Sequence, residues 1–585
     1  MSQLVVVVML VALASRISSE DEHQHQRISS EDELKPPTVM IVMLVRNKEP
    51  YLPYTLTQLS ELDYPKERLA LWIHSDHNED RSAELLAAWL AEYRSLYRSV
   101  HAVLNTTSPP LRPDESSAID MSEGRYRDVI KLKEDALAAA RRIWADFVWF
   151  LDADVILHEA AVLRQLIEMR KPVVAPMLRT HGAYSNFWAG MDDNFYYRRT
   201  EEYGQIYGSK KRGCFSVPMV HSCVLVNLLS TRSDGLTFVR EKLPAPIGPT
   251  SDDVITFALS ARQAGMEMHV CNQRDFGQMP IPLRSPEVLG KEWLNIVNIK
   301  LEMMVDHPPP PVASVLRPFV PDPPEKTKLG FDHIYMIGLA RRPDRRRRML
   351  LAFDELGIDA ETVDAVDGRQ LNDSALAELG VAMLRDYRDP INDRRLTFGE
   401  IGCFLSHHRV WSDMVEHGHE RVIVFEDDLR FASYFNYRLE RLMAEVDALN
   451  LDWDLIYLGR KIMRTDEEWV AGAQRLVHPS YTYWTLAYAL TRRGAEKLLK
   501  EEPLGKMIAV DEYLPIMFGQ HPNTGWAAQF SGAGSLLAYS ASPLLVTPIK
   551  YTGEPGYVSD TEDAGTIGAE LEGTCSVDGC PTPAN

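Results

Sequence analysis

The chain has 585 residues, of which 45% are hydrophobic and 25% charged, and its formal net charge is −20. One hydrophobic core rarely organises a chain of this length, so two or three domains are expected. The negative charge argues against a protein that coats nucleic acid, because phosphates require a basic surface. Local clusters of arginine can still bind the phosphates of a small molecule.

The first 36 residues form two segments that precede the folded part. Residues 1–15 join an apolar run to small residues, the pattern of a secretory signal peptide cleaved near Ala14. Residues 16–36 are acidic and polar and predict a disordered leader. No later stretch reaches 18 uninterrupted apolar residues, so we expect no membrane span in the mature protein.

Residues 37–305 predict a first α/β domain. The apolar segments 38–47 and 69–78 have the pattern of buried strands, and each is followed by a segment of helical spacing, at 51–62 and 82–93. Strand–helix–strand order implies a parallel sheet with right-handed crossovers.

A pair of acids follows the next apolar run of this domain. The run FVWFL ends in Asp152 and Asp154, which places both carboxylates at the carboxyl edge of the predicted sheet, where open α/β folds bind ligands. Two such carboxylates repel each other unless a cation neutralises them, and their oxygen ligands suit Mg²⁺ or Mn²⁺. The pair could instead mark a strand end that faces water, but the cost of burying charge favours a site for a metal and a diphosphate.

Three further segments complete the chain. Residues 306–328 contain a run of prolines and predict a polyproline-like spacer. Residues 329–557 predict a second α/β domain with its own series of strands. Residues 558–585 are acidic and Gly-rich and predict a flexible tail. The fold class is therefore α/β, with two tandem domains built on mostly parallel central sheets.

The strongest constellation lies in the second domain, where the apolar run RVIVF ends in Glu426, Asp427 and Asp428. If the strand is buried on both faces, three consecutive acids cannot all point to solvent. A cation bound here would neutralise the diphosphate of a departing nucleotide sugar and act as a Lewis acid. An acidic surface loop is the alternative, and the cost of burying charge disfavours it.

A basic stretch follows the first strand of the second domain. Arg341, Arg342 and Asp344 come directly after that strand, at the ligand edge of the sheet, and we expect them to contact a nucleotide. The arginines at 345–348 run into a helical pattern, and we expect them to form its solvated face.

Two acidic pairs begin helical patterns and could provide a base. These pairs are Asp252-Asp253 and Asp511-Glu512. A carboxylate at the start of a helix is favoured by the helix dipole and is often only a cap. Alternatively, one acid removes a proton from an acceptor hydroxyl, and the residues alone do not decide between these two roles.

The six cysteines and two sequons are compatible with an oxidising compartment. Cys575 and Cys580 could close a small loop in the tail. Asn105 and Asn372 begin acceptor sequons for N-glycosylation, which agree with a luminal location.

The second domain resembles glycosyltransferase family 25. The stretches IYMIGLARRPDRRRRM, DAVDGRQL, LTFGEIGCFLSHHRVW, VIVFEDDL, WDLIYLG, YALTRRGAEKLL and VDEYL follow in that family's order between 329 and 555. In the first domain, WIHSDHN, FLDADV and SDDV resemble the A-type nucleotide-sugar fold. The resemblance therefore implies two tandem nucleotide-sugar-binding domains of the A-type, Rossmann-like glycosyltransferase fold.

The resemblance also implies an activity. It implies a metal-dependent, inverting galactosyltransferase of the endoplasmic reticulum lumen, which moves galactose from UDP-galactose to hydroxylysine hydroxyls of collagen. The cofactor would be Mn²⁺ or another divalent cation. Inversion requires a base, for which Asp511 and Glu512 are the candidates. The chain ends without the retrieval signal usual in animal members, so lysyl hydroxylases are considered as retaining partners and a second copy of the chain as a further partner.

The resemblance assigns further residues to the two sites. Bacterial members correspond to the second domain only, so we expect catalysis there, with a structural or binding role for the first. Asp76 and Asn78 of the first domain would contact a nucleotide. The residues expected to shape the donor pocket of the second domain are Gly399, Glu400, Ser406 and His407.

Two other functions stay open. One is a non-catalytic collagen-binding or adhesion protein built on a transferase scaffold, which the intact acidic triplet and the intact VDEY segment disfavour. The other is the same chemistry with another sugar or acceptor, because one hydroxyl distinguishes galactose from glucose.

Overall fold

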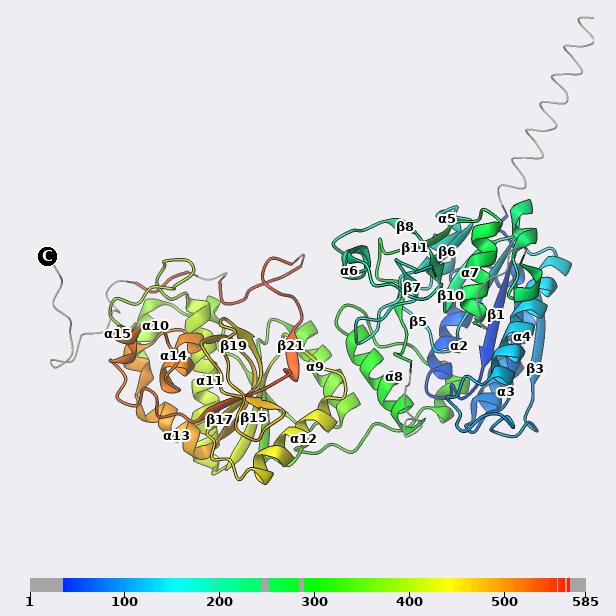
Figure 1. The fold of residues 1–585 in the computed structure, drawn as a ribbon. Helices are drawn as coiled ribbons and strands as arrows, with labels where there is room; N and C mark the ends of the chain where they lie inside the picture. Colours follow the sequence, from blue (N-terminus) through cyan, green and yellow to red (C-terminus); the bar gives the residue numbers. More distant parts are fainter. Residues whose placement is uncertain are drawn as a thin grey trace, which may run out of the picture. The chain divides into compact units, whose positions relative to one another are not determined.

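The computed structural model of the chain contains two compact units (Figure 1). Unit one comprises Met1–Ile296 and Pro310–Pro321, and unit two comprises Val297–Pro309 and Asp322–Asn585. The predicted signal peptide, most of the predicted leader, and Cys575 and Cys580 lie outside the described residues. The structure describes residues 35–193, 195–243, 252–282, 289–554, 556–562 and 565–568.

The first unit is built on an eight-stranded sheet. Its strands are β1 (Val39–Val45), β2 (Leu69–Ser75), β3 (Ser99–Leu104), β4 (Phe147–Leu151), β6 (Val173–Pro176), β8 (Cys214–Val217), β10 (Cys223–Asn227) and β11 (Met268–Cys271). They lie in the order β3-β2-β1-β4-β10-β6-β11-β8. Only β8 and β10 run against the other six, so the predicted mostly parallel sheet is confirmed. Short pairs flank it: β5 (Ile156–Leu157) with β12 (Gly277–Gln278), and β7 (Phe187–Trp188) with β9 (Met219–Val220).

Helices cover both faces of this sheet. They are α2 (Leu52–Glu61), α3 (Ser82–Tyr93), α4 (Glu123–Arg142), α5 (Val162–Glu168), α6 (Glu201–Tyr207) and α7 (Asp253–Gln263), with short 3₁₀ turns between them. The helix α8 (Leu289–Met303) begins in the first unit, and its residues from Val297 on belong to the second. Side chains of β1 alternate between two cores, as a strand buried on both faces requires. Val39 and Ile41 pack with α2, α3 and α5, whereas Met40 and Val42 pack with α4 and α7.

Two features of the first unit were not predicted from sequence. Cys214 and Cys271 form a disulfide between the paired strands β8 and β11. The 3₁₀ turn η6 (Ser314–Phe319) lies within the predicted proline-rich spacer, yet its Leu316 is fully buried in the core beside α2 and α3. The Ala313 N–H donates to Thr57 Oγ1 at 2.8 Å, which fixes the start of this turn.

The second unit is built on a seven-stranded sheet. Its strands are β13 (His333–Gly338), β14 (Glu361–Asp364), β15 (Arg421–Glu426), β17 (Leu455–Ile462), β18 (Leu476–Val477), β19 (Thr482–Thr491) and β20 (Ala538–Ala541). They lie in the order β14-β13-β15-β19-β17-β20-β18, and only β18 and β19 run against the other five. Beside it, β16 (Leu429–Phe431) pairs with β21 (Val546–Pro548).

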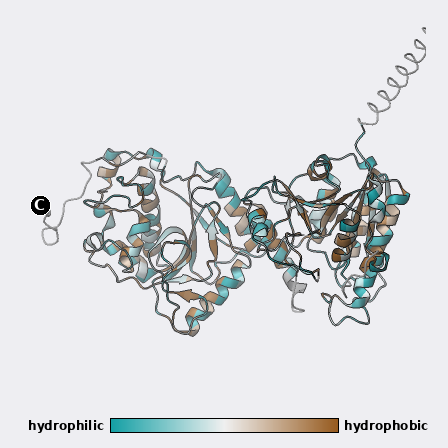
Figure 2. Ribbon diagram, turned by 45° about the horizontal axis from the view of Figure 1, so that its top comes forward, coloured by the Kyte–Doolittle hydropathy of each residue, from teal (hydrophilic) through white to brown (hydrophobic). Residues whose placement is uncertain are grey.

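Helices again cover both faces, so each unit is a three-layer α/β/α structure whose strands are largely hydrophobic (Figure 2). Tyr335 and Ile337 of β13 pack with α11, α13 and α14, whereas Ile334 and Met336 pack with α9 and α12. The predicted α/β class with two tandem domains is confirmed. The helices are α9 (Pro343–Leu356), α10 (Asp373–Glu378), α11 (Phe398–His417), α12 (Phe435–Ala448), α13 (Arg492–Lys500), α14 (Val510–Met517) and α15 (Thr524–Ala527).

The described residues after 555 are held against the second unit. Ile567 is buried in the core, and its N–H donates to the Leu396 carbonyl at 3.0 Å. The Phe398 N–H donates to the Gly565 carbonyl at 2.7 Å. These contacts bring 556–562 over the start of α11. The segment overlaps the start of the predicted flexible tail, and the buried Ile567 helps to hold it in place, which an acidic composition does not reveal.

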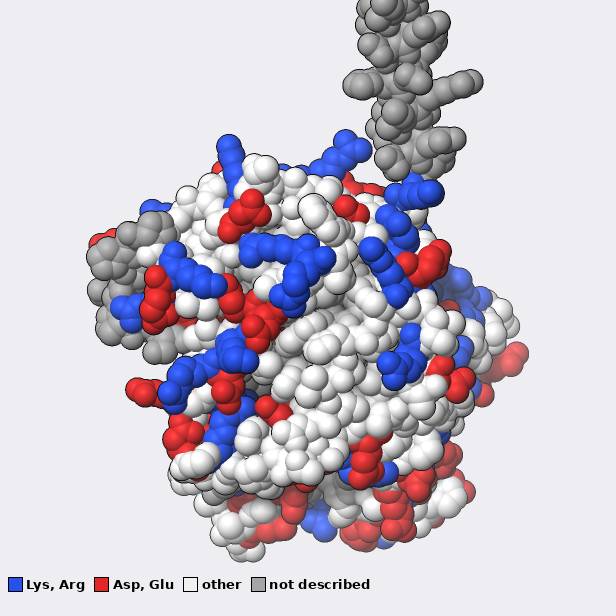
Figure 3. Space-filling model, turned by 90° about the vertical axis from the view of Figure 1, so that its right-hand side faces the viewer, with Lys and Arg blue, Asp and Glu red and all other residues white. Residues whose placement is uncertain are grey.

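The surface carries charges of both signs. On the face drawn in Figure 3, lysine and arginine side chains are interspersed with acidic ones among wide uncharged areas. Within the part of the chain that the structure describes, no helix combines the length and hydropathy needed to cross a membrane.

Candidate active site

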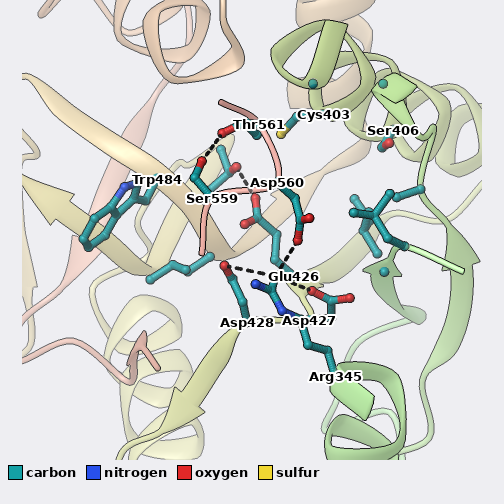
Figure 4. Close-up of a pocket in the computed structure, with 18 of the residues that line it drawn as sticks. Arg345, Cys403, Ser406, Glu426, Asp427, Asp428, Trp484, Ser559, Asp560 and Thr561 are labelled. Carbon is teal, nitrogen blue, oxygen red and sulfur yellow. Dashed lines mark hydrogen bonds and ion pairs between the residues drawn. The ribbon is translucent and has the colours of Figure 1, made fainter. Parts of the chain in front are cut away.

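A cavity of about 190 Å³ opens in the second unit where β13 and β15 end. These strands are parallel neighbours, so their carboxyl ends meet at one edge of the sheet, where open α/β folds bind ligands. Figure 4 shows acids, an arginine and hydroxyl groups converging on this space. Its charged and polar lining comprises Arg341, Arg345, Asp367, Cys403, Ser406, His407, Glu426, Asp427, Asp428, Thr485, Asp511, Lys550, Tyr557, Ser559, Asp560 and Thr561.

The acidic triplet lies on one side of this cavity. Glu426 ends β15, in which the four preceding residues, 422–425, are fully buried, and Asp427 and Asp428 form the turn to β16. Asp427 Oδ2 and Asp428 Oδ1 are buried without a hydrogen-bond partner among the described residues. An unpartnered buried carboxylate oxygen is unfavourable, whereas a divalent cation with oxygen preference would satisfy both atoms. The residues present therefore fit a hard divalent cation.

The protonation of the triplet agrees with this interpretation. Burial raises the pKa of Asp428 to about 7, and the negative charge of Glu426 adds to the rise. Burial likewise raises the pKa of Asp427, although the Arg345 guanidinium opposes it. Burial would also raise the pKa of Glu426, but hydrogen bonds from His407 and Thr485 leave it below its ordinary value. A bound cation would reverse the rise, because it favours the charged forms.

A chain of hydrogen bonds orients Glu426. His407 Nε2 lies 3.1 Å from Glu426 Oε1, and the Thr485 hydroxyl donates to the same oxygen. His407 Nδ1 lies 2.9 Å from the Tyr488 hydroxyl, which also accepts from Trp411 Nε1 at 2.9 Å. The side chains of this chain, His407, Thr485, Tyr488 and Trp411, are all buried. The Glu426 carboxylate is therefore held in one orientation before any ligand binds.

Three arginines from the start of α9 and the turn before it lie near Asp560, and one of them also lies beside the triplet (Figure 4). Arg341 and Arg342 each place a nitrogen 2.7 Å from an Asp560 oxygen, and Arg345 lies 3.3 Å from the same carboxylate. Arg345 Nη1 also lies 3.5 and 3.7 Å from the two aspartates of the triplet. The expectation of a solvated face is therefore wrong for Arg345, because the first turn of α9 directs its side chain into the cavity. Arginine forks at this edge suit phosphate oxygens.

The two acids at the start of α14 take different roles. Asp511 lines the cavity, and burial, followed by the negative charges of Glu426 and Glu512, raises its pKa to about 8. Glu512 points away from the cavity and is 1% exposed. It accepts hydrogen bonds from two tyrosine hydroxyls at 2.7 and 2.5 Å and from His521 Nε2 at 2.7 Å. Glu512 thus holds α14 in place, and Asp511 alone can reach a substrate.

Some of the residues predicted to shape the donor pocket line the cavity, and others do not. Gly399, Ser406 and His407 line the cavity from α11. Glu400 does not: it closes a capping box with Thr397 and pairs with an arginine at 2.7 Å. Arg342 reaches the site only through its contact with Asp560. Asp344 is an exposed residue of the first turn of α9 and is not part of the cavity wall.

Sequence reasoning missed several residues of this cavity. Asp560 comes from the predicted tail, although the stretch around it has five acidic or hydroxyl residues in succession. Trp484 lines the cavity with φ of 66°, which is unusual for a bulky residue, and its backbone N–H donates to Asp511. Thr485 and Cys403 belong to apolar stretches that carry no separate signal.

The acids of the first unit have positive partners within the protein. Lys48 Nζ lies 2.6 Å from Asp154 Oδ2. Burial raises the pKa of Asp152 to about 6, and the partly buried Lys133, which pairs with Asp253, opposes the rise. Lysines therefore supply compensating charge in the first unit, whereas two oxygens of the second unit's triplet lack a hydrogen-bond partner among the described residues, although Arg345 lies near them.

The remaining predicted residues of the first unit make internal contacts. Asp76 lies 3.5 Å from Arg112 and 3.4 Å from His74. The Asn78 side chain accepts from the Asn47 N–H at 2.9 Å, which joins the ends of β1 and β2. Asp252 caps α7, which was the alternative to a catalytic base for the pair Asp252-Asp253. Its carboxylate accepts from two backbone N–H groups at 2.8 and 3.0 Å.

Comparison with known proteins places both units in one family. Residues 36–300 match the model of the glycosyltransferase family 25 N-terminal domain, and residues 331–514 match that of glycosyltransferase family 25 (LPS biosynthesis protein). A glycosyltransferase 25 family member of Drosophila pseudoobscura pseudoobscura is 45% identical, covering 96% of this chain and 91% of the relative.

Two vertebrate relatives match almost as much of the chain. Procollagen galactosyltransferase 1-A of Xenopus laevis is 45% identical, covering 94% of this chain and 90% of the relative. Procollagen galactosyltransferase 2 of Homo sapiens is 43% identical, covering 93% and 86%. With such identity along nearly the whole length, the chain belongs to glycosyltransferase family 25.

Proposed function

We propose that this glycosyltransferase is a metal-dependent, inverting galactosyltransferase that transfers galactose from UDP-galactose to hydroxylysine hydroxyls of collagen. The names of its vertebrate relatives support the sugar and the acceptor. One observation carries the placement of catalysis in the second unit: Asp427 and Asp428 line a cavity that also presents arginines, and each has a buried oxygen without a hydrogen-bond partner among the described residues.

The cavity can hold the diphosphate of a nucleotide sugar. A divalent cation such as Mn²⁺ bound by Glu426, Asp427 and Asp428 would neutralise charge on the departing diphosphate. Arg341 and Arg345 line the same space, and their guanidinium groups can donate to phosphate oxygens. Donor recognition thus combines a cation at the triplet with arginines of the same cavity.

Asp511 is the proposed base. Inversion of configuration needs a single displacement, in which a base takes the proton of the acceptor hydroxyl. The raised pKa of Asp511, about 8, makes it a strong acceptor once ionised. Neutralisation of the Glu426 charge would lower this pKa, so that Asp511 is ionised near neutral pH when the site is complete.

The first unit has a structural or binding role in this proposal. Its Asp154 already pairs with Lys48, and the positive charge of Lys133 acts on its Asp152, so these acids have less need of a cation. The alternative of a non-catalytic scaffold finds no support in the second unit, whose acids and base face one cavity.

We also propose that the protein works in the lumen of the endoplasmic reticulum. The disulfide between Cys214 and Cys271 is of the kind that persists in oxidising compartments. Asn105 and Asn372 of the two sequons are exposed and thus accessible to glycosylation. Retention through a lysyl hydroxylase and a homodimer stay predictions.

The test is a transfer assay on the purified full chain with UDP-galactose, a hydroxylysine peptide and Mn²⁺, with and without a chelator. We expect the double variant Asp427→Asn/Asp428→Asn to lose transfer by at least about 10²-fold while it stays folded. Asp447→Asn, which changes an exposed acid on α12, is the matched control and should keep its activity.

Two outcomes would overturn the assignment. Full turnover by the double variant would remove the triplet from the mechanism. Loss of all activity in a well-folded Asp152→Asn/Asp154→Asn variant would place catalysis in the first unit. UDP-glucose offered in place of UDP-galactose tests the sugar, and an unmodified lysine peptide tests the acceptor.

A further inference from the structure

We propose that the cavity contains a second cation site, made by Cys403, His407 and Glu426 and selective for a thiophilic divalent cation such as Zn²⁺. This inference deepens the proposed function, because the site shares Glu426 with the triplet and so regulates the same cavity. Occupation by Zn²⁺ would inhibit transfer by withdrawing a ligand from the hard cation.

The three side chains converge from two elements. Cys403 and His407 are four residues apart on α11, so they project from the same face on successive turns. Glu426 arrives from the end of β15. One ligand atom from each residue lies within 4.8 Å of the other two.

The distances suit a tetrahedral ion. His407 Nε2 and Glu426 Oε1 are 3.1 Å apart, close to the roughly 3.3 Å that separates two ligands at zinc distances of about 2.0–2.1 Å. All three residues line the cavity, so a fourth position opens toward solvent or substrate. Three protein ligands with one open position differ from a structural zinc site, in which the protein supplies all four ligands.

Neighbouring groups orient the ligands. A zinc-bound histidine usually donates its second ring N–H to a fixed acceptor. The Tyr488 hydroxyl oxygen lies 2.9 Å from His407 Nδ1 and can accept that proton, which leaves Nε2 for the metal. The Thr485 hydroxyl donates to Glu426 and holds the carboxylate against the imidazole. The site is therefore preorganised.

The donor set selects the ion. A thiolate, an imidazole and one carboxylate suit Zn²⁺, whereas the oxygen-only set of the triplet suits Mn²⁺. On binding, the S–H bond of Cys403 breaks and its proton passes to solvent, while the His407 ring proton that Nε2 donates to Glu426 moves to Nδ1, where the Tyr488 hydroxyl can accept it. Sulfur–metal and Nε2–metal bonds form in place of the two bonds to hydrogen. Because Glu426 belongs to both sets, the two cations compete for one carboxylate.

Co²⁺ is the spectroscopic probe for this site. The test uses the folded full chain in a Cys575→Ser/Cys580→Ser background, so that the cysteines outside the described residues do not contribute. Titration with Co²⁺ should give a thiolate-to-metal charge-transfer band that saturates at one equivalent and disappears when Zn²⁺ is added. The triplet cannot produce this band, because it has no sulfur ligand.

Two cysteine variants test whether the Co²⁺ charge-transfer band arises from Cys403. Cys403→Ser should abolish it and weaken Zn²⁺ binding by about 10²-fold or more. Cys223→Ser, which changes the buried free thiol of the first unit, is the matched control and should retain it. A band that persists in Cys403→Ser, or no band in the parent chain, would overturn the proposal.

A second measurement avoids dependence on a variant that fails to fold. In the parent chain, Zn²⁺ should protect Cys403 from alkylation by iodoacetamide, read by mass spectrometry, and Mn²⁺ should not. Equal modification with and without Zn²⁺ would overturn the proposal.

The transfer assay separates this inference from the proposed function. The Zn²⁺ concentration that halves transfer should rise in proportion to Mn²⁺, and should rise at least about tenfold in Cys403→Ser. The charge-transfer band without any galactosyl transfer would overturn the proposed function and leave the zinc site standing. Transfer without the band would overturn the zinc site alone.

Discussion

Replacing Asp511 with asparagine tests whether this residue holds a raised pKa in the cavity. The change keeps the shape of the side chain and its ability to accept from the Trp484 N–H, but removes the ionisable proton. Folding raises the pKa of Asp511 from 3.8 to about 8, through burial first and then the charges of Glu426 and Glu512. Between these two values the folded protein holds a proton that the unfolded chain has released, so stability falls as pH rises.

The magnitude follows from the shift. At pH 7 the solution lies about 3 units above the pKa of Asp511 in the unfolded chain. Keeping the side chain protonated in the folded protein therefore lowers the free energy of unfolding by about 4 kcal/mol, at 1.36 kcal/mol per unit. Because Asp511 still contacts water in the cavity, solvent screening should reduce this to between about 1 and 4 kcal/mol. At pH 5 only about one unit separates the two states, so the penalty should be about 1 kcal/mol or less.

Urea unfolding of the metal-free chain at pH 5 and pH 7, followed by hydrogen exchange in α14, measures this difference. We expect Asp511→Asn to be more stable than wild type at pH 7, to gain less at pH 5, and to lose transfer by at least about 10²-fold. Asp447→Asn should show no pH-dependent gain. A variant that is destabilised equally at both pH values, or that keeps full turnover, would refute the reasoning.

Three further changes test the contacts that surround the sites. Lys48→Met should destabilise the first unit by about 3–5 kcal/mol in urea unfolding at pH 7, and adding Asp154→Asn should restore most of it, because an unpaired buried charge is the cause; no recovery would contradict this. Glu512→Ala should cost about 2–5 kcal/mol and lower transfer, since two tyrosine hydroxyls and an imidazole lose their acceptor; a neutral effect on unfolding would show that α14 does not depend on it. Gly399→Ala should raise hydrogen exchange in 556–562, because a Cβ there would lie 2.5 Å from a carbonyl of that segment; unchanged exchange would contradict that contact.

The sequence alone determined the layout of each unit. Apolar runs of strand length, separated by segments of helical spacing, predicted two α/β domains, because a strand buried on both faces needs helices on both sides. Acids directly after such runs had to lie at the carboxyl edge of a sheet. Asp152 and Glu426 could therefore be placed at ligand edges without a structure.

Only the tertiary structure decided which acids share a cavity and which have partners. Asp511 and Glu512 are neighbours in sequence, but a helix turns about 100° per residue, so one faces the cavity and the other a buried tyrosine pair. Asp560 reaches the arginines from more than 200 residues away, held by an anchor that composition concealed. Lys48 neutralises Asp154 across 106 residues. Such long-range pairs depend on how distant elements pack against each other, and a local sequence pattern does not determine that packing.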